Sequence, residues 1–525
     1  MDKFSFLNAA HIGFIADLYD QYLINPDAIE PSWRSFFQGY DLANEHYSFK
    51  DHERSIKIQE SSQEIPQEVK KEFLVVDLIN WYRTRGHLFT KTNPVRERRQ
   101  YYPSLAIETF GLLNEDLQKE FSAGQVIGLG KTTLATIIQH LQTIYSNSIG
   151  VEYMYMRNPE KIKWWQSRLN QNDNHPNYSP DAKKYILSKL NQAVTFENFL
   201  QTKYVGQKRF SLEGGEALIP GISVLLRDAA EKFGVKECVL GMAHRGRLNT
   251  LVNIFKKPVR DLFSEFEGKD FEEEDIDGDV KYHLGITLSK TFRNGSEIIM
   301  NLVPNPSHLE TVAAVAEGIT RAKIDKKYNG DSSKILPIII HGDAAIAGQG
   351  IAYEIVQMAK LNGYKTGGTV HVVVNNQIGF TTNYLDARSS TYCTDVGKVT
   401  LSPVLHVNAD DIEAVCHAME MALEFRMRFK ADVFIDLLGY RKYGHNEGDE
   451  PRFTQPKLYK AIAKHKNPKE IYAQKLISEG VIDNAYLDSI TEEFKEMLDR
   501  EFDLSKEDKN SKVIEFMQST WEGFV

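Results

Sequence analysis

Two polar turns in the middle of the chain contain residue types that bind a divalent cation. The turn His341-Gly342-Asp343 follows the apolar run 335–340, and Asn375-Asn376 follows the apolar run 369–374. Both runs are short and rich in β-branched residues, which is typical of buried parallel strands. A carboxylate and an amide oxygen at two strand ends suit Mg²⁺, which prefers oxygen ligands and completes its shell with water and ligand phosphates.

The residues between the two turns predict how those side chains are positioned. A helical pattern over residues 349–361 separates the two runs, so the segment is predicted to form a βαβ unit. A right-handed crossover makes the strands parallel and brings both turns to the carboxyl edge of the sheet, where open α/β sheets bind ligands. Small residues at 342, 344 and 345 would let a diphosphate approach the backbone. The alternative is an ordinary polar turn in which Asp343 caps the helix.

The sequences around these turns, HGDAAIAGQG and VVVNNQIGFTT, resemble the metal-and-diphosphate motif of thiamine diphosphate enzymes. It is most similar to the first, decarboxylating component of the 2-oxoglutarate dehydrogenase complex, and the similarity extends over essentially all 525 residues. The general motif has Gly where this chain has Ala344, and Ala is usual in this branch. The resemblance implies an α/β thiamine diphosphate-binding fold. Its parallel sheet is flanked by helices and preceded by a helical domain and an amino-terminal docking helix.

The resemblance also implies a role for each site residue. Asp343, Asn376 and the backbone carbonyl of Ile378 would hold Mg²⁺. Together with these, the residues that would hold thiamine diphosphate are Arg245, Ser307, Leu309, Ala344 and Ala345. Three histidines, His244, His283 and His445, would orient the substrate or move protons.

Two of these histidines also stand in sequence contexts that suit chemistry. His244 and Arg245 follow the apolar run 239–242, where a permanent charge and a proton near neutral pH suit an anionic ligand. His445 precedes Glu447 and Asp449, whose carboxylates can tune its pKa for proton transfer. The alternatives are a structural histidine at a strand end and a loop histidine in a charged turn.

A third segment, NPSHLE at residues 305–310, is predicted to start a helix. Ser307 would cap that helix, and its free backbone N–H groups would face an anion.

Two further motifs imitate binding loops. GQVIGLGKTT, at residues 124–133, has Gln125 where a phosphate loop requires Gly, so Thr132 or Thr133 is expected to cap a helix instead. The acidic segment 265–279 lacks the closing Glu of a calcium loop and is expected to be solvated charge.

Composition indicates an ordinary globular protein. Of the 525 residues, 42% are hydrophobic and 26% are charged, and the net charge of −9 argues against nucleic acid or an anionic membrane as a partner. No apolar run is long enough to span a bilayer, and the first residues match neither a signal peptide nor a transit peptide, so a bacterial cytoplasm is expected. Cys238, Cys393 and Cys416 have neither metal-site nor disulfide spacing and are expected to be buried thiols.

Composition shifts and the resemblance together divide the chain into five predicted segments. These are a docking segment at 1–43, a linker at 44–67, a helical domain at 68–192, a thiamine diphosphate- and Mg²⁺-binding domain at 193–453, and a helical connector at 454–525. The amphipathic helix predicted over residues 11–23 either docks onto other components or packs back on its own subunit.

The resemblance implies oxidative decarboxylation of 2-oxoglutarate in the tricarboxylic acid cycle. The succinyl group would pass to the lipoyl group of the dihydrolipoyl succinyltransferase partner, in a complex that also contains dihydrolipoyl dehydrogenase, and the chain would form a homodimer. A second catalytic half follows in the family and is missing here, so the chain is either a fragment or pairs with a separate chain. The alternatives are a non-catalytic assembly protein and the same chemistry on 2-oxoadipate.

Overall fold

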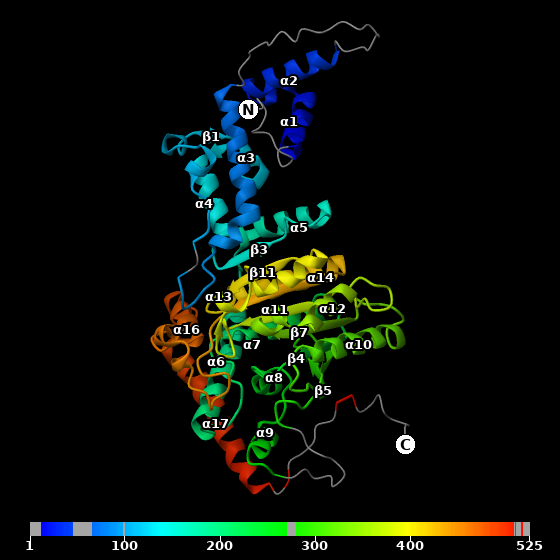
Figure 1. The fold of residues 1–525 in the computed structure, drawn as a ribbon, viewed down its shortest axis with the longest axis vertical. Coiled ribbons are helices and arrows are strands. Elements are labelled where there is room, and N and C mark those ends of the chain that lie inside the picture. The colour runs from blue at the N-terminus through cyan, green and yellow to red at the C-terminus, as the bar shows by residue number, and fades with distance from the viewer. Residues whose placement is uncertain are drawn as a thin grey trace. The chain divides into compact units, whose positions relative to one another are not determined.

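The computed structural model describes residues 12–45, 66–97, 100–269, 280–508, 510 and 516–517. Contacts group the chain into two compact units: residues 1–89 with 100–146, and residues 90–99 with 147–525 (Figure 1). The five segments predicted from the sequence have other boundaries and remain a prediction. Most of the expected linker, and residues 270–279 of the acidic segment, lie outside the described residues.

The first unit is mainly helical. Its helices are α1 (Ile12–Ile24), α2 (Pro31–Glu45), α3 (Gln67–Arg85) and α4 (Leu134–Tyr145), and β1 (Glu120–Phe121) pairs with β2 (Thr132–Thr133). The predicted amino-terminal helix therefore forms, as α1. The buried ring of Trp33 in α2 packs edge-on against Phe73 of α3 at 5.3 Å, so α2 packs within its own unit.

The segment that imitates a phosphate loop forms a helix cap, as expected. The side-chain oxygen of Thr133 accepts a hydrogen bond from the backbone N–H of Thr136 in the first turn of α4. That bond satisfies one of the N–H groups left free at a helix start.

The second unit is built on an eight-stranded sheet in the order β3-β11-β12-β8-β7-β4-β6-β5. The six inner strands are parallel: β11 (Val404–Asn408), β12 (Val433–Leu438), β8 (Val370–Asn375), β7 (Ile335–Gly342), β4 (Glu237–Met242) and β6 (Glu297–Leu302). The edge strands β3 (Ile149–Glu152) and β5 (Ile286–Thr291) are antiparallel to their neighbours. The residues of the inner parallel strands are mostly buried, and many are β-branched. This explains why these strands appear in the sequence as continuous apolar runs.

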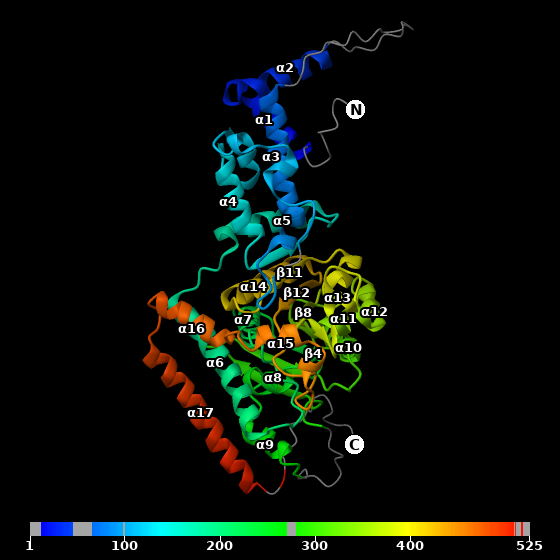
Figure 2. The same ribbon diagram turned by 60° about the vertical axis from the view of Figure 1, so that its left-hand side comes forward.

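Helices flank this sheet (Figure 2). Those that follow or join its strands are α7 (Leu218–Glu231), α8 (Arg247–Asn253), α10 (Thr311–Lys326), α11 (Asp343–Gly348), α12 (Gly350–Met358) and α14 (Ile412–Phe429). The others are α5 (Pro159–Asn170), α6 (Pro180–Lys203), α9 (Val259–Phe266), α13 (Tyr384–Ala387), α15 (Pro456–Ile462), α16 (Pro468–Ser478) and α17 (Asn484–Glu507). One apolar core joins Val312 of α10 and Ile355 of α12 to Val239 and Ile339 of the sheet.

The α/β class and the predicted βαβ unit are confirmed. β7 and β8 are parallel neighbours, with Gly342 paired to Val374. The short helix α11 begins at Asp343 and precedes α12. The sequence pattern did not reveal β3, which has four residues and lies in a stretch of helical periodicity.

The three cysteines are buried and free, as expected. Among the described residues, the model contains no helix whose length and apolar character would let it cross a bilayer.

Candidate functional site

The turns after β7 and β8 meet at the carboxyl edge of the sheet. Asp343 is buried and begins α11, and its carboxylate accepts hydrogen bonds from its own backbone N–H and from that of Asn376. The two turns, separated by a whole helical crossover in the sequence, therefore touch.

Side-chain amides fix the turn after β8. The side chain of Asn375 donates to Asp436 at 2.9 Å and accepts from the backbone N–H of Gln377 at 3.1 Å. Gln377 has a left-handed backbone and exchanges two side-chain hydrogen bonds with Asn93, at 2.8 and 3.1 Å. The side-chain oxygen of Asn376 accepts from the backbone N–H of Ile378 at 3.3 Å, which leaves one lone pair of that oxygen for another partner.

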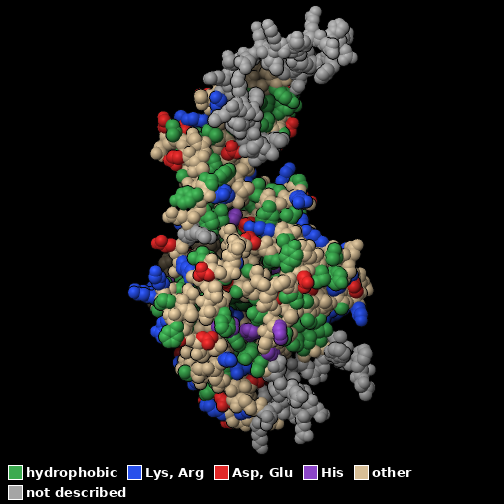
Figure 3. All heavy atoms as spheres, viewed as in Figure 1, with side chains coloured by type: hydrophobic (Ala, Val, Ile, Leu, Met, Phe, Trp, Pro, Cys, Tyr) green, Lys and Arg blue, Asp and Glu red, His purple; other side chains and the backbone are tan. Residues whose placement is uncertain are grey.

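A cavity of about 110 Å³ opens above these turns. Its walls contain nine of the eleven predicted site residues: His244, Arg245, Leu309, Asp343, Ala344, Ala345, Asn376, Ile378 and His445. The structure thus brings together side chains from four separate strand ends. Histidine side chains gather beside hydrophobic ones on the face of this unit drawn in Figure 3.

His283 and Ser307 are not part of the cavity wall. They contact each other, with 3.2 Å between the Ser307 hydroxyl and His283 Nε2. The ring of His283 lies against Tyr282 at 5.3 Å, and Tyr282 in turn lies 6.1 Å from the ring of His244. His283 therefore adjoins the cavity through Tyr282.

The prediction that Ser307 caps a helix is wrong. Helix α10 begins at Thr311, and its N-cap position is Glu310, which has a left-handed backbone with φ of 70°. The carboxylate of Glu310 is bonded to His341 Nδ1 at 2.5 Å, and His341 Nε2 lies 3.0 Å from His371. This buried link holds the 305–310 segment to the end of β7 as a loop, so the helix starts only after it.

The donor set at the cavity floor fits a hard cation. Burial raises the pKa of Asp343 to about 6, and the charge of Arg388, 3.9 Å away, opposes that rise. A buried carboxylate with one distant cation as its partner gains from a nearby divalent ion. An amide oxygen and a backbone carbonyl beside it match the ligands that Mg²⁺ takes.

The glycines of the site also fit a ligand with phosphate groups. A Cβ added to Gly342, which lines the cavity, would meet no atom within 4 Å, so open space lies over this position. A Cβ on Gly379 would lie 2.5 Å from the Cβ of Ala344, so the loop and α11 can approach only because position 379 is glycine.

His244 and His445, two of the three histidines that line the cavity, both have a lowered pKa. Burial, followed by the charge of Arg245, lowers the pKa of both His244 and His445 to about 4. The carboxylates of Asp449 and Glu447, which we expected to tune His445, raise its pKa by less than burial and the arginines lower it. His244 Nδ1 is buried and has no hydrogen-bond partner among the described residues, so it is free to meet a ligand.

The cavity also contains residues that the sequence did not single out. Arg441 follows β12, His341 is the second-last residue of β7, and Phe380 follows the turn after β8. Phe380 is largely exposed, at 64%, and its ring stacks obliquely on that of His445 at 4.5 Å. A signal was available for His341, since it is a polar residue directly after the predicted strand at residues 335–340.

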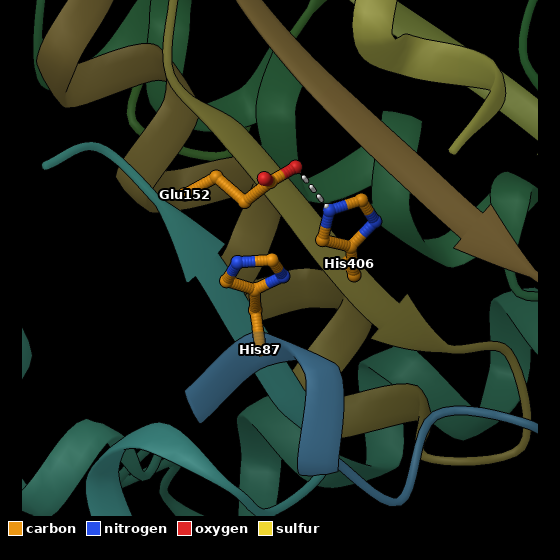
Figure 4. Close-up of side chains that lie close together, drawn as sticks. All are labelled: His87, Glu152 and His406. Atoms are coloured by element: carbon orange, nitrogen blue, oxygen red, sulfur yellow. Dashed lines mark hydrogen bonds and ion pairs between the residues drawn. The ribbon is translucent and has the colours of Figure 1, made fainter. Parts of the chain in front are cut away.

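A buried chain of hydrogen-bonded charged side chains supports the turn after β8. His406 of β11 bonds to Glu152 of β3 at 2.9 Å (Figure 4). Its other ring nitrogen bonds to Asp436 of β12, also at 2.9 Å. Burial alone would lower the pKa of His406, but the hydrogen bonds to the two carboxylates raise it overall. Asp436 in turn accepts from Asn375, so the edge of the sheet is linked to the cavity floor.

Comparisons with known proteins show which proteins this chain is similar to. Residues 188–514 match the family model for the dehydrogenase E1 component, and residues 4–44 match the 2-oxoglutarate dehydrogenase N-terminus. The chain is 42% identical to a 2-oxoglutarate dehydrogenase E1 component of Azotobacter vinelandii, over 94% of this chain and 54% of that protein. It is 37% identical to the protein with the same description in Brucella anthropi, over 99% of this chain and 57% of the relative. The chain therefore spans about half the length of these curated relatives.

Proposed function

This chain belongs to the dehydrogenase E1 component family, and from that premise we propose that it is the cofactor-binding half of a 2-oxoglutarate dehydrogenase. It would bind thiamine diphosphate with Mg²⁺ and act in the oxidative decarboxylation of 2-oxoglutarate. The observation that carries this proposal is that Asp343, Asn376 and Arg245 line one cavity although they follow three different strands.

In this proposal the cavity floor holds the metal and the diphosphate. Asp343, Asn376 and the backbone carbonyl of Ile378 provide oxygen ligands for Mg²⁺, and Arg245, Ala344 and Ala345 surround the diphosphate, with Leu309 on the cavity wall. The hydrogen bond between Asp343 and Asn376 supports the metal assignment, because it brings both turns within reach of one ion. Ser307, outside the wall, acts by holding His283.

The chemistry at the carbonyl carbon comes from the cofactor. When bound, thiamine diphosphate supplies an electron sink for the pair left behind by departing carbon dioxide. The chain's own residues bind and position the 2-oxo acid. His244 offers a free Nδ1, and His445, neutral and partly exposed, can accept or donate a proton beside it. We assign to His283, which contacts Tyr282 beside the cavity, the role of orienting the far carboxylate of a dicarboxylic substrate.

The same proposal assigns partners. The relatives are named as E1 components, which supports a multienzyme complex in which the succinyl group passes to the dihydrolipoyl succinyltransferase and dihydrolipoyl dehydrogenase completes the cycle. The match of residues 4–44 supports a role for α1 and α2 in that assembly. We further infer a homodimer from the resemblance to this family, and a bacterial cytoplasm because the matched relatives come from bacteria.

Calorimetric titration with thiamine diphosphate and Mg²⁺ tests the proposal. The chain alone is expected to bind weakly and to turn over little, because its relatives continue for almost as many residues again. Adding a separate polypeptide that corresponds to the uncovered part of these relatives should tighten Mg²⁺-dependent binding and restore decarboxylation. A panel of 2-oxoglutarate, 2-oxoadipate and pyruvate then identifies the substrate. Absence of Mg²⁺-dependent binding by the reconstituted pair would refute the proposal.

A further inference from the structure

Arg441 is a buried cation that faces the cavity with an unused donor. Its side chain is 4% exposed and lines the cavity wall. Its Nε donates to the backbone carbonyl of Tyr443 at 3.0 Å and to the hydroxyl of Tyr459 at 3.2 Å, and its Nη2 donates to the carbonyl of Phe380 at 3.0 Å. Within the described part of the chain, Nη1 makes no hydrogen bond. The guanidinium is therefore fixed in orientation but incompletely bonded.

No carboxylate lies within 4 Å of Arg441 among the described residues. The neighbouring Arg245 is in the same situation, because it donates only to the backbone carbonyls of Ser211 and His445. Burial, followed by the charge of Arg441, lowers the pKa of Arg245 to about 10. Two guanidinium groups thus repel each other at one cavity, and an anion placed between them would stabilise both.

Other buried arginines in the same unit show what a purely structural role looks like. Arg209 is neutralised by Glu197 and Glu213 at 2.5 and 3.1 Å. Among the described residues, Arg247 and Arg426 have no carboxylate within 4 Å, but both of their Nη atoms are bonded, and neither residue lines the cavity. Arg441 differs from all three because it combines a free Nη1 with a position in the cavity wall.

We propose that Arg441 binds an anionic oxygen of the bound ligands through Nη1, and so selects ligands that carry that charge. This inference rests on the proposed function. Two groups could supply the oxygen, the diphosphate of the cofactor and a carboxylate of the 2-oxo acid. Arginine suits a phosphate or a carboxylate, because its planar guanidinium can donate two hydrogen bonds to either group. Three hydrogen bonds within the protein already fix the orientation of Arg441.

The test uses the chain reconstituted with a polypeptide that corresponds to the uncovered part of its relatives, and the variants R441Q and R441K. If the oxygen belongs to the cofactor, R441Q weakens thiamine diphosphate binding at least tenfold in calorimetry but leaves the binding of unphosphorylated thiamine unchanged. If it belongs to the substrate, cofactor affinity is unchanged and KM for 2-oxoglutarate rises at least tenfold, with a smaller change in kcat. R441K, which keeps the charge, should recover part of either loss.

The matched control is R321Q on α10, which removes a half-buried arginine that is paired with Asp325 and does not line the cavity, and which should change none of these quantities. Thermal unfolding of each variant separates a binding defect from a folding defect, and R441K carries the test if R441Q unfolds. Unchanged cofactor affinity and unchanged KM in a folded Arg441 variant would overturn the inference. Failure of the unaltered protein to bind thiamine diphosphate would instead count against the proposed function.

Discussion

The guanidinium of Arg245 donates a 2.6 Å hydrogen bond to the backbone carbonyl of His445, 200 positions further along the chain. The two residues follow β4 and β12, and in the sheet β8 and β7 lie between those strands. The loops after the two outer strands therefore reach across the ends of the inner pair and meet each other. This contact closes the cavity over the turns that contain Asp343 and Asn376.

The first prediction concerns the only carboxylate among the proposed metal ligands. D343N keeps the size of the side chain and removes its charge, so Mg²⁺-dependent affinity for thiamine diphosphate should fall at least 100-fold in calorimetry. D325N, on the exposed face of α10, is the control and should bind as tightly as the unaltered protein. Full affinity in D343N would remove Asp343 from the metal site.

The second prediction compares two glycines at the same cavity. G342A adds a methyl group in open space and keeps an ordinary extended backbone, so the melting temperature should not change. That methyl would occupy the space proposed for the diphosphate, so cofactor affinity should fall about tenfold or more.

G379A places a methyl 2.5 Å from the Cβ of Ala344, so it should lower the melting temperature itself. Calorimetry and thermal unfolding of the two variants separate these effects. A G342A protein that binds as tightly as the unaltered one would show that the space over Gly342 is not used.

The third prediction concerns the pH dependence given by His406. Its pKa in the folded protein is raised, so its two ion pairs stabilise the fold fully below pH 6.5, and this contribution is lost as pH rises through the higher folded pKa. H406Q should be about 3 kcal/mol less stable near pH 6, because two buried carboxylates lose a cation. The difference from the unaltered protein should shrink above neutral pH in urea unfolding.

H465Q is the control for that measurement. His465 pairs with a single carboxylate, Asp410, and is partly exposed. The difference in unfolding free energy between H465Q and the unaltered protein should therefore be smaller at every pH than that for H406Q. A gap between H406Q and the unaltered protein that stays constant from pH 6 to 9 would show that the proton on His406 does not stabilise the fold.

The fourth prediction concerns Glu216, whose substitution should raise stability instead of lowering it. Burial, followed by the charge of Glu213, raises the pKa of Glu216 from 4.5 to about 8. Stability is therefore lost as pH rises from about 4.5 towards 8, because the unfolded chain releases this proton first. E216Q can still accept the hydrogen bond from Gly214, so it should match the unaltered protein near pH 4.5 and exceed it by roughly 4 kcal/mol above pH 8.

Urea unfolding across this pH range checks the prediction, with E354Q on the exposed face of α12 as a control that should not change the pH dependence. If E216Q and the unaltered protein keep parallel stability profiles, Glu216 is ionised in the folded state.

The sequence predicted the sheet edge better than the support around it. The two short apolar runs and the helical pattern between them are local features of the sequence, and they predict a βαβ unit. The general right-handedness of such crossovers was then sufficient to place Asp343 and Asn376 at the same edge of the sheet. The helix expected from Ser307 failed because Glu310 is held by His341, a contact between segments that no local pattern encodes. Arg441 was missed for a similar reason, since its free Nη1 becomes visible only when its other donors are placed.

The chain crosses between its two units three times, after residues 89, 99 and 146. The short excursion of residues 90–99 gives the second unit Asn93, the partner of Gln377 beside the proposed metal site. A shortened protein starting at residue 147 would keep every strand of the large sheet but lose this brace. Trimming the amino-terminal third is thus not a neutral way to obtain a minimal cofactor-binding domain, and residues 90–99 would have to be grafted back.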